Sequence, residues 1–346
     1  MVQNKSAVFL KFPSEFPIPG EHFAIQTKDL HVSLKNNEIL ARNLYFSLDP
    51  YMRGRMVDAP SYIPHFQPQK PMSGYGVAEI IESKNPAFPV GSLVSGMTGW
   101  EQYSVIPEQF TKLLRVLPKS ARESKKIPLS AWVGVLGMPG FTAYSSLKII
   151  GQPKAGETIF VSAAAGAVGQ LVGQMAKKLG LRVVGSAGSD DKVDYLLNEL
   201  KFDAAFNYKK NGTILENLKR HAPEGLDIYY ENVGGETLEA ALDCMNTHGR
   251  IIVCGMISQY NTTKPYGIRN LGQIIGKRLT MRGFINDDFA KEYMEDFVKD
   301  VSAWLEADEI IYREDVEEGI EGSLDAFVGM LKGKNFGKQV VKIADL

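Results

Sequence analysis

The sequence predicts an α/β fold in which a parallel sheet, covered by helices on both faces, follows an N-terminal lobe of β-strands. From about residue 127, short β-branched apolar segments alternate with segments whose apolar residues have helical spacing. The first 125 or so residues instead contain short strand-like runs separated by Pro and Gly. With 346 residues, the chain is long enough for two domains.

The second half of the chain alternates between the two kinds of segment. Buried strands are expected at 158–163, 182–186, 204–207, 227–232, 250–255 and 279–285. Helices are expected after residue 168 and at 190–200, 214–221 and 236–246, and a long amphipathic helix carries Phe289, Tyr293, Phe297, Val301 and Trp304 on one face. Repeated β-α-β units imply a parallel sheet with a helix layer on each side.

The N-terminal lobe is predicted from its irregular strands, among them 38–47, 76–82 and 92–97. The alternation of strands and helices ends before a last strand at 338–343, so we expect this tail to rejoin the N-terminal lobe. The predicted domains are therefore 1–126 with 310–346, and 127–309.

Composition excludes several classes of protein. The formal charge is −1, which gives no reason to expect a nucleic-acid partner. The two cysteines, Cys244 and Cys254, form no C-x-x-C pair, and the five histidines are scattered, so neither a disulfide framework nor a metal site is expected.

Residues 158–176 carry no charge, but Ser162, Gln170 and Gln174 interrupt them, which favours a buried strand turning into a helix over a membrane span. With no secretory signal visible, a cytoplasmic protein is the expectation.

A glycine-rich turn follows the first strand of the second domain. Residues 163–169 read Ala-Ala-Ala-Gly-Ala-Val-Gly, so Ala164 replaces the first glycine of G-x-G-x-x-G, while Gly166 and Gly169 keep the other two positions. Gly166 would let the backbone approach a pyrophosphate, and Gly169 would let helix and strand pack closely. The helix N-terminus then offers N–H groups to the anion. Small residues can also serve helix–sheet packing alone, but the position between a strand and a long helix favours a dinucleotide site.

The end of the second strand selects the cofactor. NAD sites usually have an acidic residue about 20 positions after the glycine motif, and here the segment 185–189 contains none. Lys192 could neutralise a 2′-phosphate as a point charge, or it could simply lie on a solvated helix face. The missing acid and the lysine together favour NADPH. Tyr208, Asn232 and residues 254–258 follow later strands and are further candidates, although each could serve only as part of a turn.

Taken together, these segments resemble the medium-chain dehydrogenase/reductase superfamily. They are most similar to its zinc-independent branch of NADPH-dependent alkenal/alkenone double-bond reductases, also called prostaglandin or leukotriene B4 reductases. The matching stretches are 49–53, 137–144, 163–169, 188–192, 206–208, 231–235, 254–261 and 333–338. The resemblance implies a Rossmann domain, which is a doubly wound parallel sheet, together with a GroES-like β-barrel catalytic domain and a homodimer.

The same resemblance implies a set of site residues. The cofactor would be bound by Gly166, Ala167, Val168, Gly169, Gln170, Lys192, Tyr208, Asn232, Cys254, Gly255, Met256, Ile257, Ser258, Tyr260, Phe284, Ile285, Asn286 and Asn335. Asn286 departs from the apolar residues of relatives. Tyr51 and Tyr260 correspond to tyrosines near the substrate carbonyl. Zinc-using relatives have a Gly-His-Glu turn where this chain has Gly74-Tyr75-Gly76, and no metal is expected.

The hypothesis that follows is reduction of the C=C bond of an α,β-unsaturated aldehyde or ketone by NADPH, with hydride delivered to the β-carbon. Tyr260 or Tyr51 would donate a hydrogen bond to the carbonyl oxygen. Two alternatives remain open. The chain could be an NADPH-dependent quinone reductase, which needs no metal either, or a cofactor-binding protein that has lost catalysis.

Overall fold

The structure is a computed structural model that describes residues 2–346. It contains two compact units: unit 1 runs up to Met138 and includes Glu314–Leu346, and unit 2 is Pro139–Arg313. The sequence pattern places the limits at 126/127 and 309/310 instead. Residues 127–138 lie in unit 1 because the 3-10 helix η2 (Leu129–Val133) packs against two strands of that unit, β3 (Ile39–Ser47) and β4 (Ser73–Ser83).

Unit 2 is built on a six-stranded sheet in which every neighbouring pair is parallel, as predicted. Its strands are β8 (Thr158–Val161), β9 (Arg182–Ala187), β10 (Ala204–Asn207), β11 (Leu226–Glu231), β12 (Met245–Val253) and β13 (Thr280–Gly283). The spatial order is β10-β9-β8-β11-β12-β13, which is the Rossmann order 3-2-1-4-5-6. The direction of winding reverses between β8 and β11, and the crevice at such a switch point is where dinucleotides bind.

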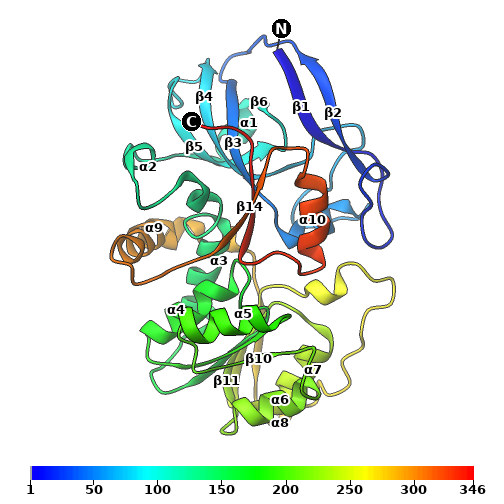
Figure 1. Ribbon diagram of the computed structural model, residues 1–346, viewed down its shortest axis with the longest axis vertical. Helices are drawn as coiled ribbons and strands as arrows, with labels where there is room; N and C mark the ends of the chain where they lie inside the picture. Colours follow the sequence, from blue (N-terminus) through cyan, green and yellow to red (C-terminus); the bar gives the residue numbers. More distant parts are fainter. Residues whose placement is uncertain (1) are drawn as a thin grey trace. The chain divides into compact units, whose positions relative to one another are not determined.

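The helices of unit 2 follow from right-handed crossovers between parallel strands. Helices α4 (Gly169–Lys178) and α5 (Asp190–Asp194) pack on β8, β9 and β10, whereas α6 (Ile214–His221) and α7 (Gly235–Cys244) pack on each other and on β10 and β11 (Figure 1). The sheet core stacks Phe160 on Tyr229 and Phe206, with ring centroids 5.0 and 6.0 Å apart. A short helix α8 (Gln273–Gly276) precedes β13.

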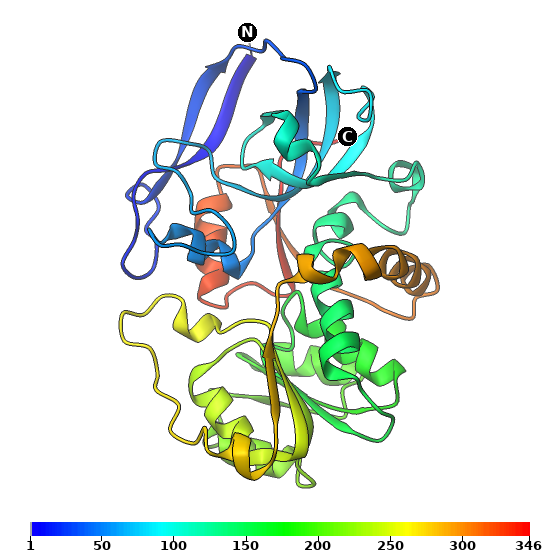
Figure 2. The same cartoon turned by 180° about the vertical axis from the view of Figure 1, so that it is seen from behind.

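Helix α9 (Ala290–Glu306) is the predicted amphipathic helix, and it buries Phe297, Val301 and Leu305. Its partner is a helix that the sequence pattern did not predict, α3 (Met138–Ser146), which continues as a π-helical turn to Gly151. Phe297 contacts the rings of Phe141 and Tyr144, with centroids 5.4 and 5.7 Å apart. Figure 2 shows α9 alongside α3 from behind.

Unit 1 is the predicted β lobe, of GroES-like type. Its main sheet has the order β14-β15-β3-β4-β5-β7, with β6 paired to β3. The strands not yet bounded are β5 (Leu93–Gly99), β6 (Tyr103–Ile106), β7 (Leu114–Val116), β14 (Glu314–Glu318) and β15 (Lys338–Lys342), and a separate hairpin joins β1 (Val2–Phe9) to β2 (Phe23–Leu30). Short helices α1 (Glu108–Thr111) and α2 (Ser120–Glu123) lie between strands, and α10 (Ser323–Leu331) precedes β15.

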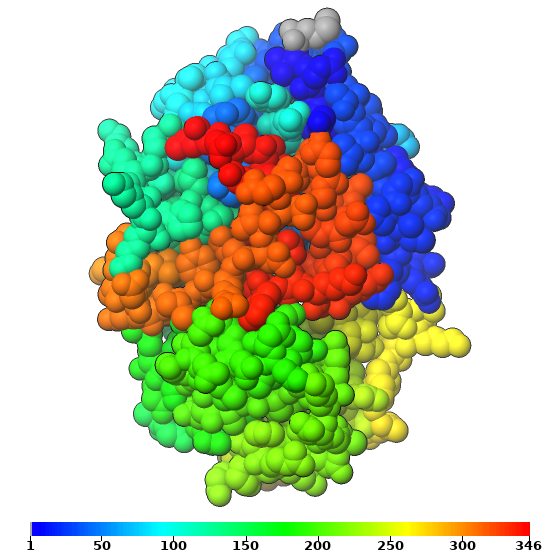
Figure 3. Space-filling model, viewed as in Figure 1, coloured from blue at the N-terminus to red at the C-terminus, as the bar shows by residue number. Residues whose placement is uncertain are grey.

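The C-terminal tail rejoins unit 1, as predicted, because β15 pairs antiparallel with β3 through Val340 and Ser47. The last residues lie on the surface of that unit beside segments from early in the chain (Figure 3). Strand β14, which pairs parallel with β15, was not predicted. Its sequence, Glu-Asp-Val-Glu-Glu, has four acidic residues and only one apolar one, so it lacks the composition of a strand.

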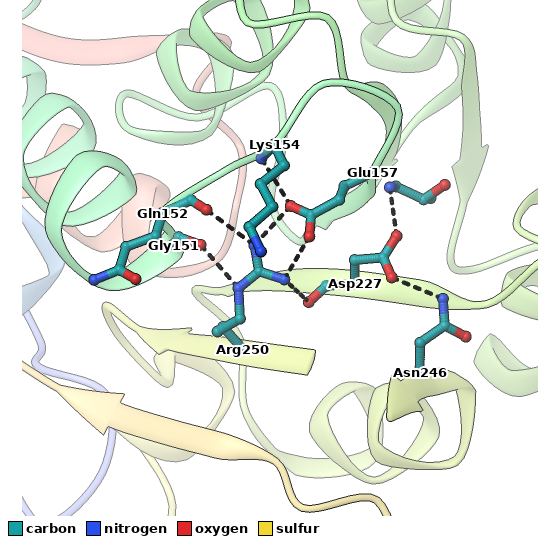
Figure 4. Close-up of polar contacts among 8 residues, drawn as sticks. Gly151, Gln152, Lys154, Glu157, Asp227, Asn246 and Arg250 are labelled. Carbon is teal, nitrogen blue, oxygen red and sulfur yellow. Dashed lines mark hydrogen bonds and ion pairs between the residues drawn. The ribbon is translucent and has the colours of Figure 1, made fainter. Parts of the chain in front are cut away.

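The amino-terminal edge of the unit 2 sheet is closed by a network of polar contacts (Figure 4). Arg250 in β12 donates two hydrogen bonds to the carboxylate of Glu157, at 2.9 and 2.6 Å, and one to the carbonyl of Gly151 at 2.9 Å. Asp227 accepts from the backbone N–H of Thr158 at 2.8 Å and from the amide of Asn246 at 2.9 Å. These bonds tie the starts of β8, β11 and β12 to one another.

Candidate functional site

The residues of unit 2 predicted to bind a cofactor lie at the opposite, carboxyl-terminal edge of the sheet. This follows from the topology, since all six strands run in the same direction. Residues 166–170 follow β8, Lys192 follows β9, Tyr208 follows β10, Asn232 follows β11, residues 254–260 follow β12, and residues 284–286 follow β13. The fold therefore brings together groups that are more than 100 positions apart in the chain.

The glycine-rich turn after β8 leaves no room for a side chain at Gly169. A Cβ atom at Gly169 would lie 2.6 Å from the carbonyl oxygen of Ala163 and 2.7 Å from the Cα of Ala164. The turn needs one residue with positive φ, and that residue is Ala163, at 48°. The position aligned with the missing first glycine, Ala164, is not the left-handed one. This is why alanine is tolerated at Ala164.

The head of helix α4 is formed by this turn. Gly166, Ala167 and Val168 are partly exposed. The N–H groups of residues 170–172 already donate to the carbonyls of Gly166 and Val168, so the candidates for contact with an anion are the N–H groups of residues 167–169. Gln170 behaves differently from its neighbours. It is buried, and its side-chain oxygen accepts from the hydroxyl of Tyr195 and the N–H of Arg313, both at 2.9 Å. Its side chain thus stabilises unit 2, and its backbone N–H donates to the carbonyl of Gly166 at 3.1 Å, so the structure does not support a contact of Gln170 with the pyrophosphate.

The turns after β8 and β11 are joined at the switch point. The side-chain amide of Asn232 donates to the carbonyl of Ser162 at 2.7 Å, and the N–H of Asn232 donates to the Ser162 hydroxyl at 3.0 Å. Asn232 is therefore held at the point where the winding of the sheet reverses. Two glycines later in the same turn, Gly234 and Gly235, have φ of 74° and 57°, which other residues rarely adopt.

Glu231, at the end of β11, organises the same turn. Its Oε1 accepts from the N–H of Val233 at 2.6 Å, the N–H of Gly234 at 2.8 Å and the hydroxyl of Tyr229 at 2.8 Å. Its Oε2 is buried with no partner among residues 2–346. Burial raises the pKa of this carboxyl group, although the hydrogen bonds act in the opposite direction.

The segment after β12 is anchored through its backbone and through Tyr260. The N–H groups of Cys254 and Gly255 donate to the carbonyl of Glu231, at 2.9 and 3.0 Å. The hydroxyl of Tyr260 accepts from the N–H of Met256 at 3.0 Å, which places the phenol beside the backbone of this segment. Burial raises the pKa of Cys254 to about 12, so its thiol is neutral and not a nucleophile at ordinary pH. Ile257 and Ser258 belong to the short 3-10 turn η5 (Ile257–Gln259).

Two further strand ends complete this edge. Tyr208 is 45% exposed and continues the pairing of β10 with β9, since its N–H donates to the carbonyl of Ala187 at 3.1 Å. Lys192 is half-buried in α5. After β13, Phe284 stacks on Phe289 with ring centroids 6.0 Å apart, and Ile285 and Asn286 are partly exposed.

Tyr51 belongs to unit 1 and lies in the 3-10 helix η1 (Pro50–Met56). Its hydroxyl is buried beside Arg55, and no partner at hydrogen-bonding geometry is found for it among residues 2–346. Burial, followed by the charge of Asp49, raises the pKa of Tyr51 well above its usual value, so the phenol stays protonated. Arg55 donates to the carbonyls of Pro64 and Ser73, at 3.0 and 2.6 Å, which holds η1 against the loop that follows it.

Asn335 lies in the other site-bearing segment of unit 1, between α10 and β15. Its side chain donates to the carbonyl of Gly337 at 2.7 Å. The neighbouring Lys338 is buried, lies 3.3 Å from the carboxylate of Asp49 and donates to the carbonyl of Leu48 at 2.7 Å. This buried pair fixes the segment carrying Asn335 to the start of η1, and so to Tyr51.

Sequence reasoning did not single out Ser162 or Glu231 as members of the site. Ser162 was read as a polar interruption of an apolar run, and Glu231 only as part of a matching stretch. Both are buried polar residues next to a strand end. The signal available in the sequence was a polar residue at the end of each of two strands. That these two strands, the first and the fourth of the sheet in chain order, lie side by side follows only from the topology.

Among residues 2–346, no three His, Cys, Asp or Glu side chains are grouped so as to hold a metal ion. Within the same described range, no helix combines the length and apolar character required to cross a bilayer.

Two family models match the chain. The model described as the N-terminal domain of oxidoreductase matches residues 5–114, and the model described as zinc-binding dehydrogenase matches residues 167–303. The first falls on the β lobe, and the second covers β9 to β13 of the six-stranded sheet.

Several proteins resemble the whole chain. A 2-alkenal reductase (NADP(+)-dependent) from Nicotiana tabacum is 46% identical over 99% of this chain and 98% of its own length. A (+)-pulegone reductase from Mentha piperita is 42% identical over 99% of both. The solved structure of CurA from Vibrio vulnificus in complex with NADPH has a TM-score of 0.91 and 40% identity, covering 99% of this chain and 100% of that one.

The order of the unit 2 sheet and the GroES-like lobe define a medium-chain dehydrogenase/reductase. Identity above 40% over the full length places the chain further, and it belongs to the double-bond reductase branch of that superfamily.

Proposed function

We propose that this protein uses NADPH to reduce the C=C bond of α,β-unsaturated aldehydes or ketones. The observation that carries the proposal is the carboxyl-terminal edge of the unit 2 sheet, where a turn too tight for a side chain at Gly169 and a strand end without a carboxylate at 185–189 suit a phosphorylated dinucleotide. The 2-alkenal reductase and pulegone reductase among the relatives support the reaction class.

The residues present fit NADPH. The turn is too tight for a Cβ at Gly169, as the close packing of helix on strand in this motif requires, and a Cβ at Gly166 would lie 3.1 Å from the carbonyl oxygen of Ala163. Residues 185–189, at the end of the second strand, contain no acid. Asp190 and Asp191 follow in α5, where Asp190 is paired with Lys210, and Lys192 and Tyr208 supply a cation and a phenol. Asn232 and residues 254–258 extend from the strands next to the switch point, where we expect the ribose and nicotinamide contacts.

Bound NADPH would supply a hydride to the β-carbon of the conjugated substrate. Negative charge then develops on the carbonyl oxygen of the substrate as an enolate. We assign the stabilisation of that oxygen to a tyrosine phenol, either Tyr260 or Tyr51. The phenol of Tyr260 follows β12 and lies beside the N–H of Met256, and Tyr51 can donate because its buried hydroxyl lacks a partner in the described chain. A phenol or water then protonates the α-carbon.

Replacing Tyr260 by Phe tests the donor. Removal of one such donor typically lowers kcat by about 10²–10³-fold, and we expect a loss of this order with 2-nonenal while the Kd for NADPH stays within about twofold. Tyr266→Phe is a matched control in the same segment, because its hydroxyl binds Glu239 instead. Unchanged turnover in Tyr260→Phe would assign the role to Tyr51, which Tyr51→Phe tests in the same assay.

A substrate panel separates the two alternative functions. We expect NADPH oxidation with enals and enones to exceed that with 1,4-quinones. Faster oxidation with quinones would make the protein a quinone reductase. Tight NADPH binding without oxidation by any of the three classes would make it a cofactor-binding protein without catalysis.

We further propose a cytoplasmic homodimer. Both cysteines are free, which suits a reducing compartment. Strand β13 forms one edge of the unit 2 sheet and is largely exposed, and Ile275 in the preceding helix is 82% exposed. An unpaired edge of this kind is suited to pairing with a second copy. Sedimentation equilibrium of the full chain tests the dimer.

A further inference from the structure

The ends of β9 and β10 carry six residues, four of them charged, that we call the strand-end cluster: Gly188, Asp190, Lys192, Tyr208, Lys209 and Lys210. Of these, only Lys192 and Tyr208 were assigned to the cofactor. The two adjacent lysines, Lys209 and Lys210, are both exposed but have different surroundings.

Lys210 is already committed to a neighbour. Its ammonium group lies 2.5 Å from Oδ2 of Asp190, and the side-chain amide of Asn207 donates to Oδ1 of the same carboxylate at 2.7 Å. The bonds from Asn207 and Lys210 lower the pKa of Asp190 and keep it ionised. Asp190 is the carboxylate of the strand-end cluster, and it lies at the start of α5 facing β10. Its charge is thus neutralised within the protein.

Lys209 has no carboxylate partner among residues 2–346, and its ammonium group is directed toward the end of β9. It lies over the ring of Tyr208, 5.6 Å from the centroid. It also lies 3.4 Å from the point where a Cβ on Gly188 would be, and the hydroxyl of Tyr208 lies 3.2 Å from that point. A side chain at Gly188 would crowd both groups, so glycine keeps the space in front of them open.

The residue at the end of the second strand of a Rossmann sheet contacts the 2′ position of the adenosine ribose. NADPH differs from NADH by a phosphate at that position, which carries a charge of about −1.5 to −2 at neutral pH. A flexible ammonium group recognises such a phosphate as a point charge. We propose that Lys209 is a specificity-determining residue that selects NADPH over NADH, acting beside Lys192 and Tyr208, while Lys210 shields the phosphate from Asp190.

This inference rests on the proposed function only in taking NADPH as the cofactor, so its test uses binding rather than turnover. Adenosine 2′,5′-bisphosphate and adenosine 5′-monophosphate are compared by calorimetry on the full chain. Lys209→Met should weaken binding of the bisphosphate roughly tenfold, the size of one charge-assisted contact, and leave the monophosphate unchanged. Lys219→Met, which removes the same charge from the exposed face of α6, is the matched control and should change neither.

A second pair of variants tests the shielding. Lys210→Met should also weaken the bisphosphate, because it leaves the charge of Asp190 uncompensated, and adding Asp190→Asn should restore the affinity. The same addition should not rescue Lys209→Met, whose loss is of a direct contact.

Two results would overturn the inference. If Lys209→Met binds the bisphosphate as tightly as the unmodified protein does, Lys209 takes no part in selection, and the proposed function stands. If the unmodified protein shows no preference for the bisphosphate over the monophosphate, both the inference and the choice of NADPH are wrong.

Discussion

The two edges of the unit 2 sheet are built from the same strands but satisfy their polar groups in opposite ways. At the amino-terminal edge, Arg250 and Glu157 form a two-bonded ion pair whose side chains are only 17% and 19% exposed, and Asp227 is bonded on both oxygens (Figure 4). At the carboxyl-terminal edge, Glu231 keeps one buried oxygen without a partner in the described chain, and Lys209 has no carboxylate partner there.

The difference shows how one sheet separates stability from binding. Polar groups that are bonded within the protein hold the strands together and have no capacity left for a ligand. A ligand can be bound by backbone N–H groups without an acceptor in their own helix, by tight glycine turns and by cations without a carboxylate partner. Strained or unsatisfied groups of this kind are concentrated at functional sites. Substitutions at the two edges should therefore have separable effects.

The largest effect is expected at the carboxyl-terminal edge, from Gly169→Val. The new Cβ would meet backbone atoms at 2.6 and 2.7 Å, and backbone cannot move aside as a flexible side chain can. The turn must shift, which should raise the Kd for NADPH by about 100-fold or more, or about 2.7 kcal/mol. Fluorescence titration with NADPH measures it.

Gly276→Val is the control for this substitution, because nothing lies within 4 Å of the corresponding Cβ position. Equal losses of NADPH affinity in the two variants would contradict the role assigned to the turn.

A smaller effect, on stability rather than binding, is expected at the amino-terminal edge. Arg250→Met removes the charged partner of a largely buried Glu157 and should lower local stability by about 1.5–3 kcal/mol, the range for hydrogen bonds to charged groups. Native-state hydrogen exchange of the β11 and β12 amides should report this loss, with the Kd for NADPH unchanged. Arg220→Met, at an exposed position on α6, should leave exchange unaffected. A weakened Kd in Arg250→Met would show that the two edges are coupled.

The smallest effect is expected in the pH dependence of the stability that the Arg250–Glu157 ion pair contributes. Partial burial opposes ionisation of Glu157, but hydrogen bonds from Arg250 and the N–H of Lys154 outweigh it and hold the pKa below its ordinary value of 4.5. Because the pKa of Glu157 is lower in the folded state than in the unfolded state, ionisation of its carboxyl group stabilises the fold. This stabilisation is complete above pH 4.5 and declines as the pH falls through the folded-state pKa. The stability difference between the unmodified protein and Arg250→Met should thus be constant above about pH 5.5 and shrink below 4.5. A constant difference down to pH 3 would contradict the assignment.

Much of the fold could be predicted because its signals are local. The apolar segments of β8 to β13 and the helix spacing between them are read within windows of ten residues, and the direction of each β-α-β crossover follows from chirality. Strand β14 was missed because its four acidic residues give no apolar pattern, and it forms by pairing with β15. Helix α3 was missed although it is almost wholly buried, since a helix buried on all sides has no polar face to reveal its period.

The candidate site was predicted unevenly for a similar reason. Gly166, Gly169, Lys192 and Tyr208 each follow a strand, and their residue types carry the chemistry by themselves. Gln170 fits the same pattern, yet its side chain turns to Arg313, at a distance of 143 positions along the chain. Glu231 and Lys209 have ordinary residue types for a strand end and a loop, and only their neighbours in space distinguish them.

The amino-acid sequence by itself determined the class of fold, the position of the dinucleotide turn and the absence of an acid at the end of the second strand, because these depend on local pattern and on glycine geometry. Only the tertiary structure decided which of two adjacent lysines is neutralised, which carboxylate holds the turn after β11 and which edge of the sheet is closed. Those outcomes depend on electrostatic and hydrogen-bonding partners that sheet order brings together, and sheet order pairs strands that are far apart in the chain.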